Sequence, residues 1–188
     1  MNIVRVNLRQ IVQVALVTLI IFAGLQFTMQ SFRVQGTSMQ PSFHNEEYLL
    51  VDKFTYRLSS PARGDVVVFH NPQYPSELYI KRIVGMPGET IEIRRGSLYV
   101  NGVQLEEEPS FARIPQVDTY SVTVPPGYYF VMGDNRINSS GSHVFGPVSE
   151  DYIVGKVWIR YWPPSEWGLS PDYSVDYEPI TTVALESL

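Results

Sequence analysis

A long run of uncharged residues near the amino terminus constrains this chain more than any other feature of its sequence. No residue from 10 to 32 carries a charge, and residues 11–25 (IVQVALVTLIIFAGL) are almost entirely apolar. At about 1.5 Å per residue, a helix of this length crosses a bilayer's hydrocarbon core, which is about 30 Å thick. The sequence therefore predicts a transmembrane anchor over residues 10–32.

A cleaved signal peptide is the alternative for this segment, because Arg5 and Arg9 form a short basic start before the apolar stretch. The stretch is long for a signal peptide. It is also not closed by a small-x-small cleavage site, since Leu25, Gln26 and Phe27 follow the last small residues. We therefore favour an uncleaved, single-pass anchor.

The charge of the chain is divided between two environments. Residues 1–32 carry a charge of +2, whereas the remainder carries −7, within a total of −5. The basic start predicts that residues 1–9 are cytoplasmic and that the rest lies outside the cytoplasmic membrane, although Arg33 is a weak opposing signal. The acidic outer region argues against a nucleic-acid partner.

The outer region has the sequence pattern of a β protein. Short alternating or β-branched runs are separated by turns rich in proline, glycine and asparagine. Asn101 and Gly102 predict a two-residue hairpin turn. We expect a mainly β, antiparallel, barrel-like or folded-sheet domain over residues 33–166, followed by an acidic tail over residues 167–188. The expected strands are residues 48–51, 65–69, 78–84, 90–93, 97–100, 120–124, 128–132 and 156–161.

A candidate nucleophile follows the anchor almost immediately. Ser38 stands in a short turn between Gly36 and Pro41. Such a turn can present a serine hydroxyl and its own backbone N–H to one space, where the N–H would stabilise an oxyanion. An ordinary turn has the same composition, so the hypothesis requires a base within reach of the hydroxyl.

Histidine is a poor candidate for that base. His44, His70 and His143 all fall in loop-like segments, although the serine-rich surroundings of His143 leave a Ser–His–Asp triad as an alternative. The chain contains no cysteine, so thiol nucleophiles and thiolate metal sites are excluded. We predict no metal site and no cofactor.

Lysine is the better candidate. In the predicted strand 78–84, Lys81 shares a face with Tyr79 and Ile83. A desolvated lysine in this position would have a lowered pKa, and its neutral amine could take a proton from Ser38. The alternative is a lysine whose amine extends to solvent from the sheet edge.

Four sequence blocks and the anchor together resemble the bacterial type I signal peptidases, which are membrane-bound Ser/Lys endopeptidases. The resemblance extends from residue 11 to about residue 160. The blocks are residues 36–41 (GTSMQP), 64–69 (GDVVVF), 79–89 (YIKRIVGMPGE) and 133–136 (GDNR), the last followed by Ser139.

The resemblance implies specific catalytic roles. Ser38 would be the nucleophile, Lys81 the general base, and Ser139 the residue that hydrogen-bonds and orients the lysine amine. The backbone N–H of Ser38 would form the oxyanion hole. Some family members add a serine hydroxyl two residues before the nucleophile, where this chain has Gly36, so a backbone-only hole is expected here.

The resemblance also implies residues that bind substrate or shape the site. Family members line the pockets for small side chains at positions −1 and −3 of the substrate with apolar residues, and ordinary core packing is the alternative for each of them here. The residues at these positions are Phe32, Val34 and Ile80. Asp134, Asn135 and Arg136 are expected to shape the site rather than to react.

Two features depart from the family pattern. Many relatives have aspartate and arginine where this chain has Gly141 and His143, which removes an ion pair expected near the lysine. The segment of about residues 89–128 is short, so any inserted β-subdomain is expected to be small.

The implied function is removal of signal peptides from exported preproteins at the outer face of the cytoplasmic membrane, through an acyl-enzyme. The implied partners are preproteins and the lipid bilayer, with no nucleic acid. Two alternatives are a Ser/Lys autoprotease related to the SOS repressors and a non-catalytic membrane-anchored β module that binds envelope proteins. The anchor and the acidic outer region argue against the repressor-type protease.

Overall fold

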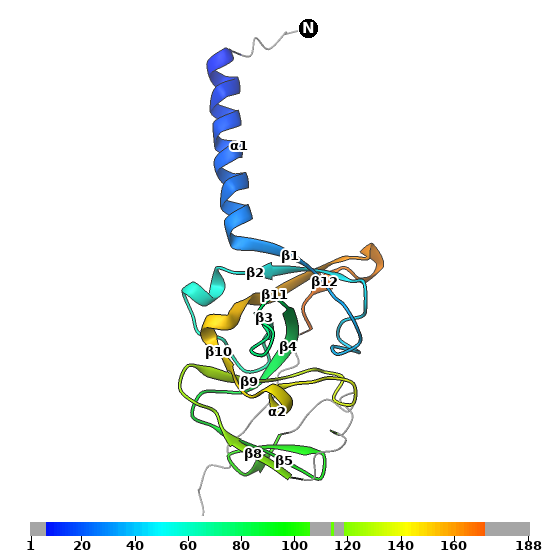
Figure 1. Cartoon of the computed structure of the whole chain (residues 1–188). Coiled ribbons are helices and arrows are strands. Elements are labelled where there is room, and N and C mark those ends of the chain that lie inside the picture. Colours follow the sequence, from blue (N-terminus) through cyan, green and yellow to red (C-terminus); the bar gives the residue numbers. More distant parts are fainter. Residues whose placement is uncertain (1–6, 106–113, 115–118, 172–188) are drawn as a thin grey trace, which may run out of the picture.

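The computed structural model describes residues 7–105, 114 and 119–171 of the chain. A single long helix stands on a domain built almost entirely of antiparallel strands (Figure 1). The mainly β fold with one amino-terminal apolar helix is therefore confirmed. The part of the expected tail from residue 172 onward lies outside the described residues.

The helix α1 spans Leu8–Thr28, and its apolar side chains project away from the rest of the molecule. Its length and composition suit a membrane span. The predicted anchor of residues 10–32 is too long at its carboxyl end, because strand β1 begins at Met29 and extends to Arg33. Residues 29–32 are uncharged, as in an anchor, but the backbone groups of β1 pair with a neighbouring strand, which the charge pattern alone does not reveal.

The larger sheet has the strand order β1-β2-β11-β3-β4-β9-β10, with β12 paired to β11, and every pair in it is antiparallel. Its strands after β1 are β2 (Tyr48–Asp52), β3 (Val66–His70), β4 (Leu78–Gly85), β9 (Tyr128–Met132), β10 (Val148–Ser149), β11 (Ile153–Trp162) and β12 (Gly168–Leu169).

A smaller sheet has the order β7-β6-β5-β8 and lies at the end of the molecule far from α1 (Figure 1). Its strands are β5 (Thr90–Arg94), β6 (Ser97–Val100), β7 (Val103–Gln104) and β8 (Thr119–Thr123), which fall within the range expected for an inserted subdomain. The turn between β6 and β7 has φ values of 50° at Asn101 and 82° at Gly102, as the predicted two-residue hairpin requires.

All eight strands expected from the sequence are present: two of them match at both ends, and the ends of the other six differ by at most three residues. Strands β1, β7, β10 and β12 were not among them, and three of the four have only two residues. The four remaining elements are short helices: α2 (Ser142–Phe145), η1 (Thr55–Arg57), η2 (Glu150–Tyr152) and η3 (Pro164–Glu166).

Three apolar clusters hold these strands together. One joins the smaller sheet to β9 through residues such as Ile91, Val100 and Phe130. The second lies under β1, β2 and the first half of β4, and includes Leu49 and Ile80. The third packs β3 against β9. The strand β4 therefore contributes to the packing of all three clusters, which makes its position rigid.

Candidate active site

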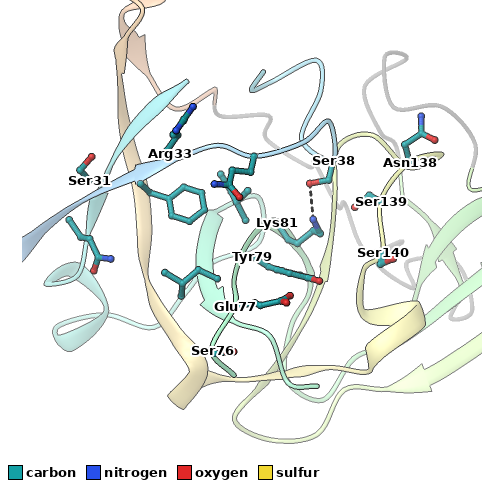
Figure 2. A pocket seen from close by; sticks show the side chains of 15 residues that line it. Ser31, Arg33, Ser38, Ser76, Glu77, Tyr79, Lys81, Asn138, Ser139 and Ser140 are labelled. Atoms are coloured by element: carbon teal, nitrogen blue, oxygen red, sulfur yellow. Dashed lines mark hydrogen bonds between the residues drawn. The ribbon is translucent and has the colours of Figure 1, made fainter. Parts of the chain in front are cut away.

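A cleft of about 820 Å³ opens between three segments that are distant in sequence. Its walls are β1, the first half of β4 with the residues just before it, and the loop that follows β9 (Figure 2). Two residues that follow β1, Gln35 and Ser38, complete the lining. The labelled polar side chains of Ser38, Lys81, Ser139 and Ser140 lie at one end of this cleft.

The two residues expected to form a dyad meet in the cleft. The Nζ atom of Lys81 lies 2.9 Å from Oγ of Ser38, within hydrogen-bond distance (Figure 2). When the amine is protonated it donates to the hydroxyl oxygen. When the amine is neutral, the hydroxyl can donate to the nitrogen, which is the arrangement that proton abstraction requires.

The surroundings of Lys81 favour the neutral amine. The residue is 4% exposed. Desolvation lowers the pKa of Lys81 from 10.5 to about 8, although the negative charge of Asp134 acts in the opposite direction. The amine also lies 5.6 Å from the centre of the Tyr79 ring. A lysine extended into solvent from the sheet edge is therefore excluded.

The backbone around Ser38 is held by the loop after β9. The amide of Asn135 donates to the carbonyl oxygen of Ser38 at 3.1 Å, and its side-chain Nδ2 donates to the carbonyl oxygen of Thr37 at 3.1 Å. The backbone N–H of Ser38 donates no hydrogen bond to any residue that the structure describes. That N–H therefore remains available to an external acceptor.

The turn that precedes Ser38 depends on a glycine. Gly36 has a φ of 86°, in the region that side chains disfavour, and its amide donates to Oδ1 of Asn45 at 2.8 Å. No described atom lies within 4 Å of the position that a Cβ would take there. A serine at this position would have room, but it would have to adopt a strained backbone conformation.

A buried ion pair lies behind the cleft. Arg82 Nε and Nη2 donate to the two carboxylate oxygens of Asp134 at 2.9 and 2.8 Å, and both side chains are completely inaccessible. Ser42 Oγ also donates to Asp134. Arg136 Nε donates to the carbonyl oxygen of Gly133 at 2.9 Å. These contacts brace the loop and do not reach the cleft.

Ser139 lines the cleft, but its expected hydrogen bond to Lys81 is not made. The Oγ atom of Ser139 is buried and has no hydrogen-bond partner within the described part of the chain. Gly133 lies against it, since a Cβ on residue 133 would come closer than 3.0 Å to both Ser139 Oγ and the carbonyl oxygen of Ser38. The close packing of these three residues leaves no space for a side chain at position 133.

The three expected pocket residues differ in position. Phe32 and Ile80 line the cleft, from β1 and β4 respectively. Val34 does not line it: the residue is 2% exposed and packs in the cluster that contains Leu49 and Ile80. The side chain of Val34 is enclosed because the chain turns after β1 and its backbone pairs with residues 46 and 47.

None of the three histidines lines the cleft. His44 is an exposed neighbour of Glu47, and His70 contacts the carbonyl oxygen of Pro75 at 2.7 Å. His143 follows the loop of Ser139, and burial, together with the positive charge of Arg136, lowers its pKa. The structure thus brings Ser38 to a lysine and to no histidine. Among the described residues, no group of His, Cys, Asp or Glu could hold a metal ion.

No role was predicted from the sequence for Gly133, Ser42 or Asn45. Gly133 belongs to the block of residues 133–136 that resembles the family, and this is the signal that could have placed it near the nucleophile. Ser42 and Asn45 meet Asp134 and Gly36 only through the fold. No local pattern marks either residue.

Comparison with known proteins agrees with this geometry. Residues 7–162 match the family model described as signal peptidase, peptidase S26. The chain is 34% identical over 169 residues to a probable signal peptidase I-1 of Synechocystis, with 86% of each chain covered. It is 33% identical over 178 residues to signal peptidase IB of Staphylococcus aureus, covering 85% of this chain and 92% of the relative.

A crystal structure of a signal peptidase I from Enterococcus faecalis is 34% identical, with a TM-score of 0.45 over 52% of this chain and 97% of that one. The family match and these two relatives favour the peptidase over the non-catalytic module and over the repressor-type autoprotease. An apolar helix long enough for a membrane anchor precedes the domain, as expected for such an enzyme. The chain therefore belongs to the peptidase S26 family, as a type I signal peptidase.

Proposed function

We propose that this signal peptidase cleaves exported preproteins by acyl transfer through Ser38, with Lys81 as the general base. The observation that carries the proposal is the 2.9 Å contact between the Ser38 hydroxyl and a buried lysine whose pKa is lowered to about 8. A serine hydroxyl needs an adjacent base to become a nucleophile, and a desolvated amine serves that purpose near neutral pH.

The reaction proceeds in two stages. Neutral Lys81 takes the proton of Ser38 as the oxygen attacks the scissile carbonyl, and the protonated lysine then gives that proton to the departing amine. The signal peptide remains as an ester on Ser38. Lys81, neutral again, activates a water molecule that hydrolyses this ester. The N–H of Ser38 has no acceptor in the described part of the chain, which supports its role as an oxyanion donor in both stages.

The substrate is proposed to bind as an extended strand between β1 and β4. Among the described strands, β1 pairs only with β2, and β9 pairs with β4 only from Arg82 onward. Both walls of the cleft therefore offer unpaired backbone edges to an extended peptide. Phe32 and Ile80 would limit the adjoining pockets to small side chains.

The position of Ser38 suits a substrate that emerges from a membrane. Ser38 is the fifth residue after the end of β1, and β1 follows α1 directly. We propose that α1 anchors the enzyme with residues 1–9 in the cytoplasm and the β domain outside. A peptide bond just beyond the apolar helix of a signal peptide would then reach the cleft.

The test is cleavage of a purified preprotein by the full chain in lipid. Ser38→Ala and Lys81→Ala should each reduce cleavage to the level of a heat-killed sample while keeping the wild-type circular dichroism. A chain with His44, His70 and His143 all replaced by glutamine is the matched control and should keep most activity. Cleavage by either dyad variant would refute the assignment. A folded but inactive histidine variant would reopen the triad.

A further inference from the structure

The turn that connects β2 to β3 begins directly beneath the helix α1. The amide of Lys53 donates to the carbonyl oxygen of Thr28, the last residue of α1, at 2.8 Å. The turn, residues 53–58, includes the short helix η1 and lies at the end of the domain nearest α1 (cyan in Figure 1). If α1 crosses a bilayer, this turn is therefore at the level of the lipid headgroups.

Two large apolar side chains of this turn are left in solvent. Phe54 is 44% exposed and Leu58 is 76% exposed. The turn itself is firmly held, because Asp52 Oδ1 accepts hydrogen bonds from the amides of Phe54 and Thr55 at 2.7 and 3.1 Å. Exposed apolar groups on a rigid turn indicate a surface that is covered in the working state.

Two cations alternate with these apolar residues. The side chains of Lys53 and Arg57 form no ion pair or hydrogen bond with the described residues, and both line a cavity of about 280 Å³ with Tyr56 and Glu150. The nearby acids interact with other groups: Asp52 binds the turn, and Asp65 binds Tyr56 and Lys156. Glu150 interacts electrostatically with Tyr129.

We propose that residues 53–58 are a binding site for the headgroups of anionic phospholipids. Lys53 and Arg57 contact lipid phosphates, while Phe54 and Leu58 enter the interfacial layer of the bilayer. The combination of free cations, exposed apolar groups and contact with the end of α1 fits a negatively charged lipid surface. The inference rests on the proposed membrane anchoring of α1.

This contact would orient the catalytic domain. A single helix leaves the domain free to tilt relative to the membrane plane, whereas a second contact with the bilayer restricts that tilt. The turn continues from β2, which pairs with β1 along all five residues of that strand, and β1 is a wall of the cleft. Lipid binding by the turn would therefore hold the cleft at a constant orientation to the membrane.

The experiment uses the absence of cysteine from the chain. Single cysteines replace Leu58 in the turn, Leu16 in α1 and Thr119 in β8 at the far end of the domain, and each carries a nitroxide label. The full chain is reconstituted in vesicles of phosphatidylcholine, alone or mixed with phosphatidylglycerol. Collision rates with oxygen and with a water-soluble nickel chelate then report the depth of each label.

We expect the label at position 58 to lie deeper than that at 119, and deeper in mixed vesicles than in phosphatidylcholine. Lys53→Gln with Arg57→Gln should reduce the equilibrium constant for insertion in mixed vesicles about fivefold for each charge. Arg94→Gln with Arg95→Gln removes the same charge from the far end of the domain, and it should have no effect.

Three results would overturn the proposal. Equal depth at positions 58 and 119, while the label at 16 is in the bilayer, would show that the turn does not touch lipid. Depth at 58 that is independent of phosphatidylglycerol and of the two cations would refute headgroup recognition. Protection of position 58 from both collision reagents would indicate burial against protein. Failure of the label at 16 to enter the bilayer would instead refute the anchoring.

Discussion

Arg82 and Asp134 form a fully buried ion pair immediately behind the contact between Lys81 and Ser38. Neighbouring residues of a strand point to opposite faces, so Lys81 reaches the cleft while Arg82 reaches the interior. The pair links β4 to the loop that also holds Ser38 through Asn135. Loss of one partner from such a pair costs about 3–5 kcal/mol, because the other charge is left buried. The dyad thus depends on an electrostatic link outside the cleft.

The pH dependence of cleavage should follow the titration of Lys81. Its lowered pKa of about 8 means that the neutral fraction rises tenfold per pH unit below that value and levels off above it. We expect kcat/KM for a peptide substrate to rise in this way and then to reach a plateau. A profile that levels off below pH 6 would contradict the role of Lys81 as base, provided that chemistry limits the rate.

The charge on Lys81 should reduce the stability of the fold. Protonating it in the folded state costs about 3 kcal/mol, from the difference between its pKa of about 8 and the ordinary 10.5. Lys81→Met should therefore be inactive but more stable near pH 7. Between pH 8 and 10.5 the unfolded wild type keeps a proton on Lys81 that the folded protein has released. Raising the pH over this range therefore stabilises the wild-type fold, and the difference in stability between wild type and Lys81→Met becomes smaller. Thermal unfolding of both proteins in detergent at several pH values measures this difference in stability. A difference that does not change with pH would contradict the prediction.

Ser139→Ala should separate catalysis from stability. The buried hydroxyl has no described partner, so its removal should leave the free energy of unfolding unchanged or raise it. If the hydroxyl orients Lys81 during the reaction, kcat should fall about tenfold to a hundredfold and the pH profile should shift, with KM little changed. Wild-type kcat and an unaltered pH profile would show that Ser139 does not position the lysine.

Gly133→Ala should damage the site through packing. A Cβ there would collide with Ser139 Oγ and with the carbonyl oxygen of Ser38, so the loop or the nucleophile must move. Such overpacking costs about 1–3 kcal/mol of stability, and a displacement near 1 Å can cost about a hundredfold in rate. Gly168→Ala is the matched control, because nothing lies within 4 Å of its Cβ position. Equal activity of the two variants would show that the loop adapts.

Gly141→Asp introduces the aspartate that the family resemblance led us to expect at this position. A Cβ at residue 141 would lie 2.8 Å from the carbonyl oxygen of Val131 and 3.2 Å from Nδ1 of His143, so any side chain there has a steric cost. Gly141→Ala measures that cost alone. We expect Gly141→Asp to lose more activity and to shift the pH profile to higher pH, because a carboxylate near the site stabilises protonated Lys81.

Adding His143→Arg should recover part of the loss caused by Gly141→Asp, since the guanidinium can bind the new carboxylate. A double-mutant cycle in preprotein cleavage measures the coupling. If Gly141→Asp behaves as Gly141→Ala at every pH, the loop does not act on Lys81 electrostatically.

Most of the secondary structure followed from local pattern. The apolar run, the alternating strands and the Asn101–Gly102 turn each depend on the chemistry of neighbouring residues, and each was recognised. Strand β1 was missed because its first four residues are uncharged and follow the anchor without a break. The two-residue strands β7, β10 and β12 are too short for any alternation to be detected.

The sequence by itself determined an apolar helix and a β domain. Its four blocks indicated the family and the candidate residues Ser38, Lys81 and Ser139. Only the tertiary structure decided how those residues meet. It placed Lys81 against Ser38, left Ser139 Oγ without a partner, and enclosed Val34 in the core. The reason is physical: periodicity fixes which face of a strand a side chain occupies. Distance and desolvation depend instead on segments far apart in the chain, such as β4 and the loop after β9, which meet only when the sheet forms.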